Sequence, residues 1–189
     1  MRRIAISQRL IFNHHGMMQE VVDSRWGNFC NRCEILPIYI PAQFDLKKID
    51  FDGLILTGSG DLFEISNKEE DKIRDELEAE LISYCLECNI PVLGICRGMQ
   101  MINKYFGGTL KKINGHVGEH LLSDGRQVNS YHNYAIDKLG KGLSVVTTAN
   151  DSVIEEIKYG DKIFAQMHHP ERRISGYDVS FVRGFFNVK

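Results

Sequence analysis

The chain has 189 residues, of which 43% are hydrophobic and 25% charged, with a formal net charge of −2 at pH 7. That length suits one domain with a substantial core, and the near-neutral charge gives no reason to expect nucleic acid as a partner. No apolar run approaches the roughly 18 residues of a membrane span, and the N-terminal segment resembles a first strand rather than a signal peptide. Five cysteines, an odd count without any sign of secretion, favour reduced thiols and a cytoplasmic location.

Apolar patterns predict alternating strands and helices through the first half of the chain. Residues 90–96 form a near-continuous apolar run, which is typical of a central parallel strand covered on both faces. A long helix is expected to begin at Asn67, which can act as its N-cap with Glu70 as the capping-box partner. In chain order the predicted elements are strand 2–7, helix 17–33, strands 34–41 and 51–61, a helix from 67, strand 90–96 and helix 97–106.

The second half of the chain is less regular. Residues 108–148 form short segments with turns at Asn114-Gly115 and Asp124-Gly125, and they predict antiparallel or irregular pieces at one edge. A further strand is predicted within 161–172 and a closing helix over 177–186. Without a repeat or a linker, we expect a single domain over residues 1–189. The predicted fold is α/β: an open, mostly parallel sheet with helices on both faces and a small antiparallel edge region.

Cys96 lies where a predicted strand turns into a predicted helix, between Gly94 and Gly98. Such a sharp turn exposes its corner side chain, and the two glycines leave space around it. The start of the following helix directs backbone N–H groups and the positive end of a dipole at the sulfur, which favours the thiolate. Cys96 is therefore a candidate nucleophile. The alternative, for this motif alone, is a buried core cysteine with incidental glycines.

His168, His169, Pro170 and Glu171 follow a second strand whose carboxyl end should reach the same edge of the sheet. A thiolate nucleophile needs a base to protonate the leaving amine, and the base needs an acceptor that orients its other ring nitrogen. His169 and Glu171 can supply these two roles, whereas His168 is expected to point the other way. On its own such a pair more often consists of solvent-exposed polar residues on a loop, but its combination with the candidate nucleophile favours a catalytic role.

The glycine-rich turn after strand 51–61 is a candidate oxyanion hole. A tetrahedral oxyanion needs two preorganised donors, and the loss of one typically costs about 10²–10³ in rate. The backbone N–H of Arg97, just after the nucleophile, would be one donor, and Gly58 and Ser59 would provide the other. An ordinary strand-to-loop turn is the alternative.

These motifs, GICRGMQ (94–100) and HPE (169–171) with the glycine-rich turn, resemble those of the class I glutamine amidotransferase superfamily. The segment VNSYHNYAI (128–136) is similar to one in its γ-glutamyl hydrolase branch, a peptidase C26-like group. The resemblance covers nearly the whole chain and implies a flavodoxin-like fold with Cys96, His169 and Glu171 as the catalytic triad. It also implies a binding site for the α-amino and carboxylate end of a glutamyl group, formed by Gln100, Asn129, Ser130, Tyr131 and His132.

The implied reaction is hydrolysis of a γ-glutamyl amide through a glutamyl thioester on Cys96. Within this branch the resemblance implies γ-glutamyl-CDP-amidate as the substrate, giving L-glutamate and cytidine diphosphoramidate in capsule polysaccharide biosynthesis. Arginine pairs two phosphate oxygens at once, so Gln8, Arg9 and Arg25 are candidates for the leaving-group pocket, although any one of these arginines is more often a solvated surface residue. Arg97 is interpreted as a free cation that could meet an anionic leaving group.

Two other functions stay open: a glutaminase subunit that releases ammonia to a partner synthase, and an inactive glutamine-binding regulatory module. The inactive module is expected to lack the nucleophile or the His-Glu pair. Apart from the synthase of the first alternative, the expected partner is a small-molecule γ-glutamyl substrate, with no nucleic acid and no membrane. We expect no cofactor and no metal, because the seven histidines show no His-x-x-x-His pair on a predicted helix. The pairs Cys30/Cys33 and Cys85/Cys88 are too far apart for a zinc ribbon and are interpreted as small buried cysteines.

Overall fold

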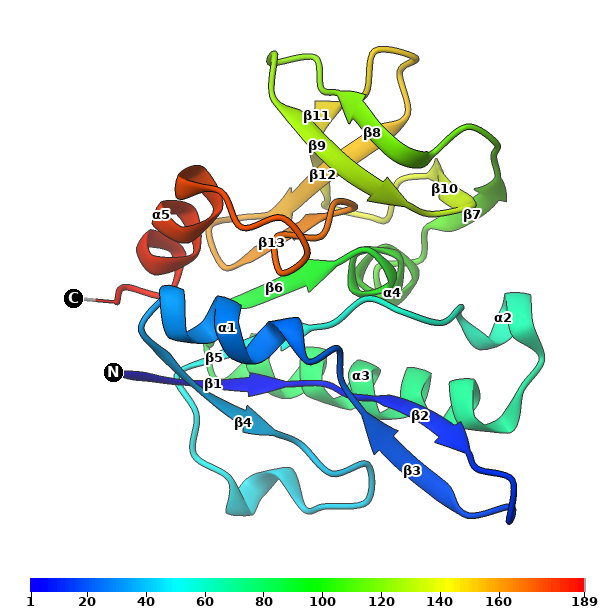
Figure 1. Ribbon diagram of the computed structural model, residues 1–189. Helices are drawn as coiled ribbons and strands as arrows, with labels where there is room; N and C mark the ends of the chain where they lie inside the picture. Colours follow the sequence, from blue (N-terminus) through cyan, green and yellow to red (C-terminus); the bar gives the residue numbers. More distant parts are fainter. Residues whose placement is uncertain (189) are drawn as a thin grey trace.

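The computed structural model describes residues 1–188, without the side chain of Lys47, so residue 189 of the predicted domain lies outside the described residues. Within residues 1–188 a seven-stranded sheet forms the centre of the molecule (Figure 1). In spatial order its strands are β11 (Ser144–Thr148), β12 (Ile154–Tyr159), β13 (Ile163–Gln166), β6 (Val92–Ile95), β5 (Gly53–Leu56), β1 (Arg2–Ile6) and β4 (Ile35–Tyr39).

The five strands from β13 to β4 pair in parallel, while β12 and β11 add to the β13 edge in the antiparallel sense. Every residue of β5 and β6 is buried, because these central strands are covered on both faces. The predicted open, mostly parallel sheet with an antiparallel edge is confirmed. The carboxyl ends of β5, β6 and β13 lie side by side, and this is where ligand sites form in open α/β sheets.

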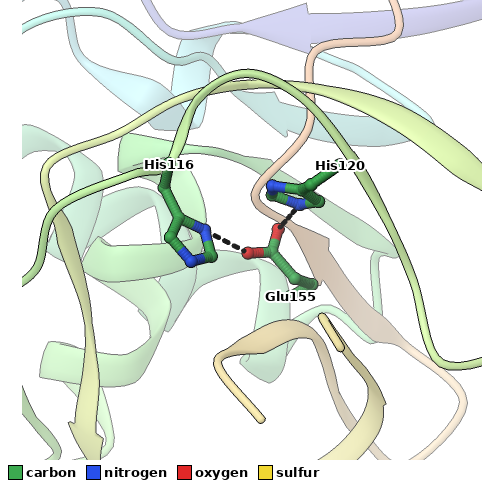
Figure 2. A group of neighbouring side chains, drawn as sticks. All are labelled: His116, His120 and Glu155. Atoms are coloured by element: carbon green, nitrogen blue, oxygen red, sulfur yellow. Dashed lines mark ion pairs between the residues drawn. The ribbon is translucent and has the colours of Figure 1, made fainter. Parts of the chain in front are cut away.

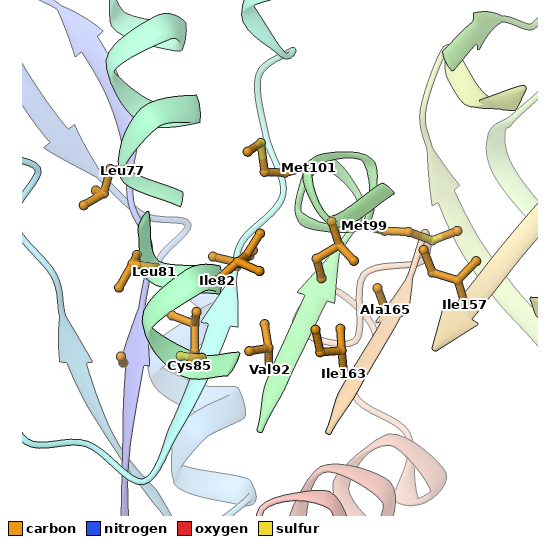
Figure 3. Packing of buried hydrophobic residues seen from close by; sticks show 14 of the residues in the cluster. Leu77, Leu81, Ile82, Cys85, Val92, Met99, Met101, Ile157, Ile163 and Ala165 are labelled. Carbon is orange, nitrogen blue, oxygen red and sulfur yellow. The ribbon is translucent and has the colours of Figure 1, made fainter. Parts of the chain in front are cut away.

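Helices cover both faces of the sheet, as predicted. The helical elements are α1 (Arg25–Arg32), η1 (Leu46–Lys48), α2 (Phe63–Ser66), α3 (Glu69–Glu87), α4 (Arg97–Tyr105) and α5 (Gly176–Phe185). The helices α3 and α4 pack on one face, where Figure 3 shows their side chains against β6 and β13. On the other face α1 and α5 form a second core. The alternation is visible along β6, where Val92 joins the first core and Leu93 the second.

The predicted helix over 17–33 is wrong in its first half. Its start instead forms β3 (Met18–Val21), which pairs with β2 (Arg9–Phe12) in an antiparallel hairpin, and α1 begins only at Arg25. The turn between the strands is closed by Asn13, whose side chain accepts two backbone N–H bonds, and by Gly16 at a φ of 72°. Apolar residues from Met17 to Val22 fit a helical period over so short a run as well as a strand, so the period alone misassigns them.

The predicted capping box at the start of α3 is also wrong. Asn67 ends the short helix α2 in the left-handed conformation, at a φ of 54°. Lys68 is the N-cap of α3 and makes no side-chain capping bond. Asparagine tolerates the left-handed region that closes a helix, so the same residue type can mark either end.

The second half contains two antiparallel pairs, as expected: β7 (Thr109–Lys112) with β10 (Tyr134–Lys138), and β8 (Val117–Leu121) with β9 (Gln127–Tyr131). The strand and closing helix predicted after residue 160 are present as β13 and α5. Figure 1 shows the β8–β9 hairpin beyond the antiparallel edge of the main sheet, close to β11 and β12. Among the described residues no helix combines the length and the apolar character needed to cross a membrane.

Candidate active site

Cys96 occupies the junction of β6 and α4 in a strained backbone conformation, with φ 51° and ψ −103°. Such a residue costs on the order of 1–3 kcal/mol and is held there by its surroundings. A side chain at Gly98 would collide with the carbonyl oxygen of Leu56, and one at Gly94 would come within 2.9 Å of the Gly98 backbone. The two glycines therefore let α4 approach the sheet closely enough to form the turn.

His169 is buried between Glu171, to which it is hydrogen-bonded, and Cys96. Its Nδ1 lies 2.6 Å from Oε1 of Glu171, and both residues are almost fully buried. Burial acts to lower the pKa of His169, but hydrogen bonds with Cys96 and Glu171 outweigh it and raise the pKa to about 9. The imidazole can therefore carry a proton next to Cys96, and a base in this position is what a nucleophilic cysteine requires.

Asn129 and Gly58 fix the position of His169. The side-chain amide of Asn129 donates to the carbonyl oxygen of His169 and accepts from its backbone N–H, each over 2.8 Å. A side chain at Gly58 would come within 2.5 Å of the His169 ring. Asn129 of β9 thus holds the backbone of His169, and the ring of His169 packs against the glycine-rich turn.

The guanidinium of Arg74, on α3, holds the carbonyl side of the glycine-rich turn. It donates to the carbonyl oxygens of Thr57 and Ser59 over 2.8 Å and to that of Gly58 over 3.4 Å. In a planar trans peptide the next N–H points opposite to the carbonyl, so the N–H groups of this turn face away from Arg74. Since Gly58 packs against the side chains of Cys96 and His169, the turn lies where oxyanion donors are needed.

The interpretation of Arg97 as a free cation is wrong. Its guanidinium is buried, at 2.5 Å from Asp75 and 2.6 Å from Glu78, and it also donates to the carbonyl oxygen of Asp61. Glu78 also binds Arg74 over 2.8 Å, so two cations share one carboxylate. Burial acts to raise the pKa of Glu78, but both arginines outweigh it and lower the pKa. A buried charge is stable only when it is paired in this way, and the network joins α3 to the residue that follows Cys96.

The segment expected to bind the glutamyl end is only partly directed at Cys96 and His169. Tyr131 stands edge-on to the His169 ring with 5.7 Å between ring centroids, next to Asn129. The hydroxyl of Ser130 donates to the carbonyl oxygen of His116, and the ring of His132 faces Glu155. Gln100 donates to the carbonyl oxygen of Tyr134. The side chains of Ser130 and His132 are thus engaged elsewhere, and the backbone N–H of His132 donates to the carbonyl oxygen of His116.

Two pockets share His169 as a lining residue. One, of about 270 Å³, is lined by Arg9, Trp26, Gly58, Ser59, Glu171 and Arg172, among others. The other, of about 220 Å³, is lined by Asn129, His168 and residues that lead to α5. His168 points toward Asp178, with Nε2 3.7 Å from its carboxylate, and so away from Glu171.

Of the three residues expected at the leaving-group pocket, only Arg9 lines the pocket of about 270 Å³ beside His169. Arg25 is exposed and paired with Asp23 over 3.3 Å, and Gln8 donates to Glu20 and to a backbone carbonyl. The sequence analysis missed Arg172, which lines the same pocket and stacks over the ring of Tyr131 at 4.6 Å. A cation directly after the HPE motif was the available signal.

Among the other cysteines, burial raises the pKa of the Cys30, Cys33 and Cys85 thiols to about 12, which makes them inert at neutral pH. Cys88 is exposed, contrary to its interpretation as a buried residue.

Comparisons with a family model, a curated protein and solved structures all point to the same family. The family model of glutamine amidotransferase class-I matches residues 10–188. The chain is 34% identical to the gamma-glutamyl-CDP-amidate hydrolase of Campylobacter jejuni subsp. jejuni, with 98% of each chain covered. A crystal structure of a glutamine amidotransferase from Thermotoga maritima superposes with a TM-score of 0.69 at 16% identity, covering 97% of this chain and 94% of the other. The crystal structure of a Thermoplasma acidophilum protein, provisionally assigned to GMP synthase, gives a TM-score of 0.77 at 20% identity, covering 99% and 93%.

Proposed function

This chain belongs to the glutamine amidotransferase class-I family, and from that membership we propose that it hydrolyses a γ-glutamyl amide with Cys96 as the nucleophile. The observation that carries the proposal is the buried His169, which is hydrogen-bonded to Glu171 through Nδ1 and lies beside Cys96, the two neighbours that raise its pKa. Glu171 orients the imidazole through Nδ1, which leaves the other ring nitrogen for the thiol.

In the proposed reaction, the Cys96 thiolate attacks the γ-carbonyl carbon and forms a C–S bond. The oxyanion of the tetrahedral intermediate accepts from the N–H groups of the Gly58–Ser59 turn and of Arg97. The C–N bond then breaks, and His169 donates its proton to the departing nitrogen. Water, deprotonated by His169, attacks the resulting thioester, so that L-glutamate leaves and the thiolate is restored.

We place the α-amino and carboxylate end of the glutamyl group near Gln100 and the backbone of residues 129–132. The support is the sequence resemblance, together with the contact between this segment and His169 through Asn129 and Tyr131. Because the side chains of Ser130 and His132 are engaged elsewhere, the proposal assigns them no direct contact with the substrate.

For the leaving group we propose a nucleoside diphosphate amidate, with γ-glutamyl-CDP-amidate as the substrate. One support is the activity for which the Campylobacter relative is named. The other is Arg9, whose buried Nε has no hydrogen-bond partner and which makes no ion pair among the described residues. Asp23, in the same pocket, is held by Arg25 and Arg172 at 3.3 and 3.7 Å, which leaves the Arg9 guanidinium available for a phosphate.

The proposed activity is tested by glutamate release from γ-glutamyl-CDP-amidate and from L-glutamine, with the purified protein acting alone. Cys96→Ala should abolish release, whereas the matched control Cys88→Ala, which removes an exposed thiol, should retain it. Faster release from the nucleotide amidate supports a hydrolase that acts alone. A preference for L-glutamine, or activity only after a synthase is added, would favour an ammonia-supplying subunit.

The leaving-group assignment has its own test in Arg9→Met. A hydrogen bond to a charged group contributes about 1.5–3 kcal/mol, so kcat/KM for the nucleotide amidate should fall about tenfold or more. The kcat/KM for L-glutamine should stay the same, because its leaving group is ammonia. Arg32→Met serves as the control, since Arg32 is exposed on α1 and does not line the pocket. An equal loss for both substrates would show that Arg9 supports the glycine-rich turn rather than the phosphate.

A further inference from the structure

Three histidines converge on one buried carboxylate at the antiparallel edge of the sheet. Glu155, on β12, is fully buried, and His116, His120 and His132 surround it from the segment before β8, from β8 and from the segment after β9. Figure 2 shows His116 and His120 directed at the two oxygens of Glu155. The catalytic mechanism uses none of these side chains, and the sequence analysis did not group them.

The distances within this cluster are long for hydrogen bonds. His116 Nδ1 and His132 Nε2 each lie 3.3 Å from Oε1 of Glu155, and His120 Nε2 lies 3.4 Å from Oε2. All five atoms are buried and have no hydrogen-bond partner among the described residues. Ligand atoms held about 2.0–2.2 Å from a tetrahedral zinc ion lie about 3.3–3.6 Å from one another. The separations of the three ring nitrogens from the carboxylate oxygens therefore fall in the range found between ligands of one ion.

The outer hydrogen bonds of two histidines fix which ring nitrogen carries the proton. His116 Nε2 lies 2.9 Å from a carboxylate oxygen of Asp151, and His132 Nδ1 lies 3.1 Å from the carbonyl oxygen of Tyr134. Both partners only accept, so these nitrogens are N–H donors, and the opposite nitrogen of each ring is the one that faces Glu155. Metal-bound histidines make the same outer bonds to a carboxylate or carbonyl.

We propose that His116, His120 and Glu155 bind one zinc ion, while His132 packs beside Oε1 of the same carboxylate. The ligand atoms of the first three residues all lie within 4.8 Å of one another. Imidazole with one carboxylate is a donor set that suits zinc among the divalent metals. The sequence analysis expected no metal, and the proposal departs from that expectation.

The ion would fasten the β8–β9 hairpin to the main sheet, because its ligands come from both. The hydroxyl of Ser130 ties β9 to His116 over 2.7 Å, and the preceding residue, Asn129, holds the backbone of His169. The zinc is therefore assigned a structural role: it would hold β9 in place, the strand whose Asn129 binds the backbone of His169. It takes no part in the chemistry at Cys96.

The test uses untagged full-length protein that carries Cys96→Ala, so that zinc cannot be held by the catalytic thiol. Zinc content is measured by elemental mass spectrometry, and zinc chloride is titrated into the chelator-treated protein by calorimetry. We expect about one zinc per chain and a higher Tm with zinc than without it. Glu155→Gln should bind at least tenfold more weakly, whereas the control His15→Gln, on the exposed hairpin turn, should bind normally.

Asp151→Asn keeps the test decisive if loss of a buried ligand unfolds the protein. Asp151 is exposed, and loss of an outer partner typically costs about 10–100-fold in metal affinity while the fold is retained. Weaker zinc binding by folded Asp151→Asn supports the site. The proposal is overturned if the chelator-treated protein binds no zinc, or if Glu155→Gln and Asp151→Asn bind it as tightly as the parent.

Discussion

Replacement of Arg74 by Met tests whether α3 holds the glycine-rich turn in place. The substitution removes an ion pair with Glu78 and the bonds to the carbonyl oxygens of Thr57 and Ser59, all at 2.8 Å and all from a fully buried guanidinium. Loss of one partner from a buried ion pair costs about 3–5 kcal/mol. Arg97 and Ser7 still contact Glu78, so we expect the lower end of that range.

The same substitution should lower kcat more than it changes KM. A turn that is no longer held would lose part of its preorganised oxyanion contacts, and one such contact is worth about 10²–10³ in rate. Stability is measured by urea denaturation and kcat by glutamate release well below the Tm. The control is Lys72→Met, an exposed position on the same helix. The reasoning is refuted if Arg74→Met keeps the parent kcat, or if its free energy of unfolding stays within about 1 kcal/mol of the control.

Two further predictions concern the junction of β6 and α4 and the protonation of His169. Gly98→Ala should destabilise the fold by about 1–3 kcal/mol in urea denaturation, because its methyl group would collide with Leu56, whereas Gly184→Ala, where space is open, should be neutral or stabilising. Equal stability of the two variants would contradict the packing argument. The pKa of His169, raised to about 9, is above its ordinary value of 6.5, so its contribution to stability is fully present below pH 6.5 and is lost as the pH rises through 9. That loss should be on the order of 3 kcal/mol and absent in His169→Gln, and matching pH profiles of the two proteins would refute it.

The fold could be predicted from the sequence because the central strands are recognisable from their own residues. Buried parallel strands such as β6 are near-continuous apolar runs, and the alternation with helices leaves few arrangements. The β2–β3 hairpin was missed because its short apolar stretch fits two periods. It is defined instead by the turn at Asn13 and Gly16.

The candidate site also has a part that the sequence predicts and a part that only the folded chain reveals. Cys96 and the His169–Glu171 pair belong to short local motifs, so their placement together follows from the order of the strands. The partners of Arg97 lie 19 and 22 residues away on another element, and no local pattern distinguishes a paired arginine from a free one. The histidines around Glu155 come from separate segments between residues 116 and 155, and only the folded chain brings them together.

Partitioning with hydroxylamine tests the central claim, a glutamyl thioester on Cys96, most directly. The protein is given γ-glutamyl-CDP-amidate or L-glutamine with increasing hydroxylamine, and both glutamate and γ-glutamyl hydroxamate are measured. A shared thioester predicts the same ratio of hydroxamate to glutamate from both substrates, rising linearly with hydroxylamine, because the leaving group has already departed. Different ratios for the two substrates, or glutamate release without hydroxamate, would contradict the account.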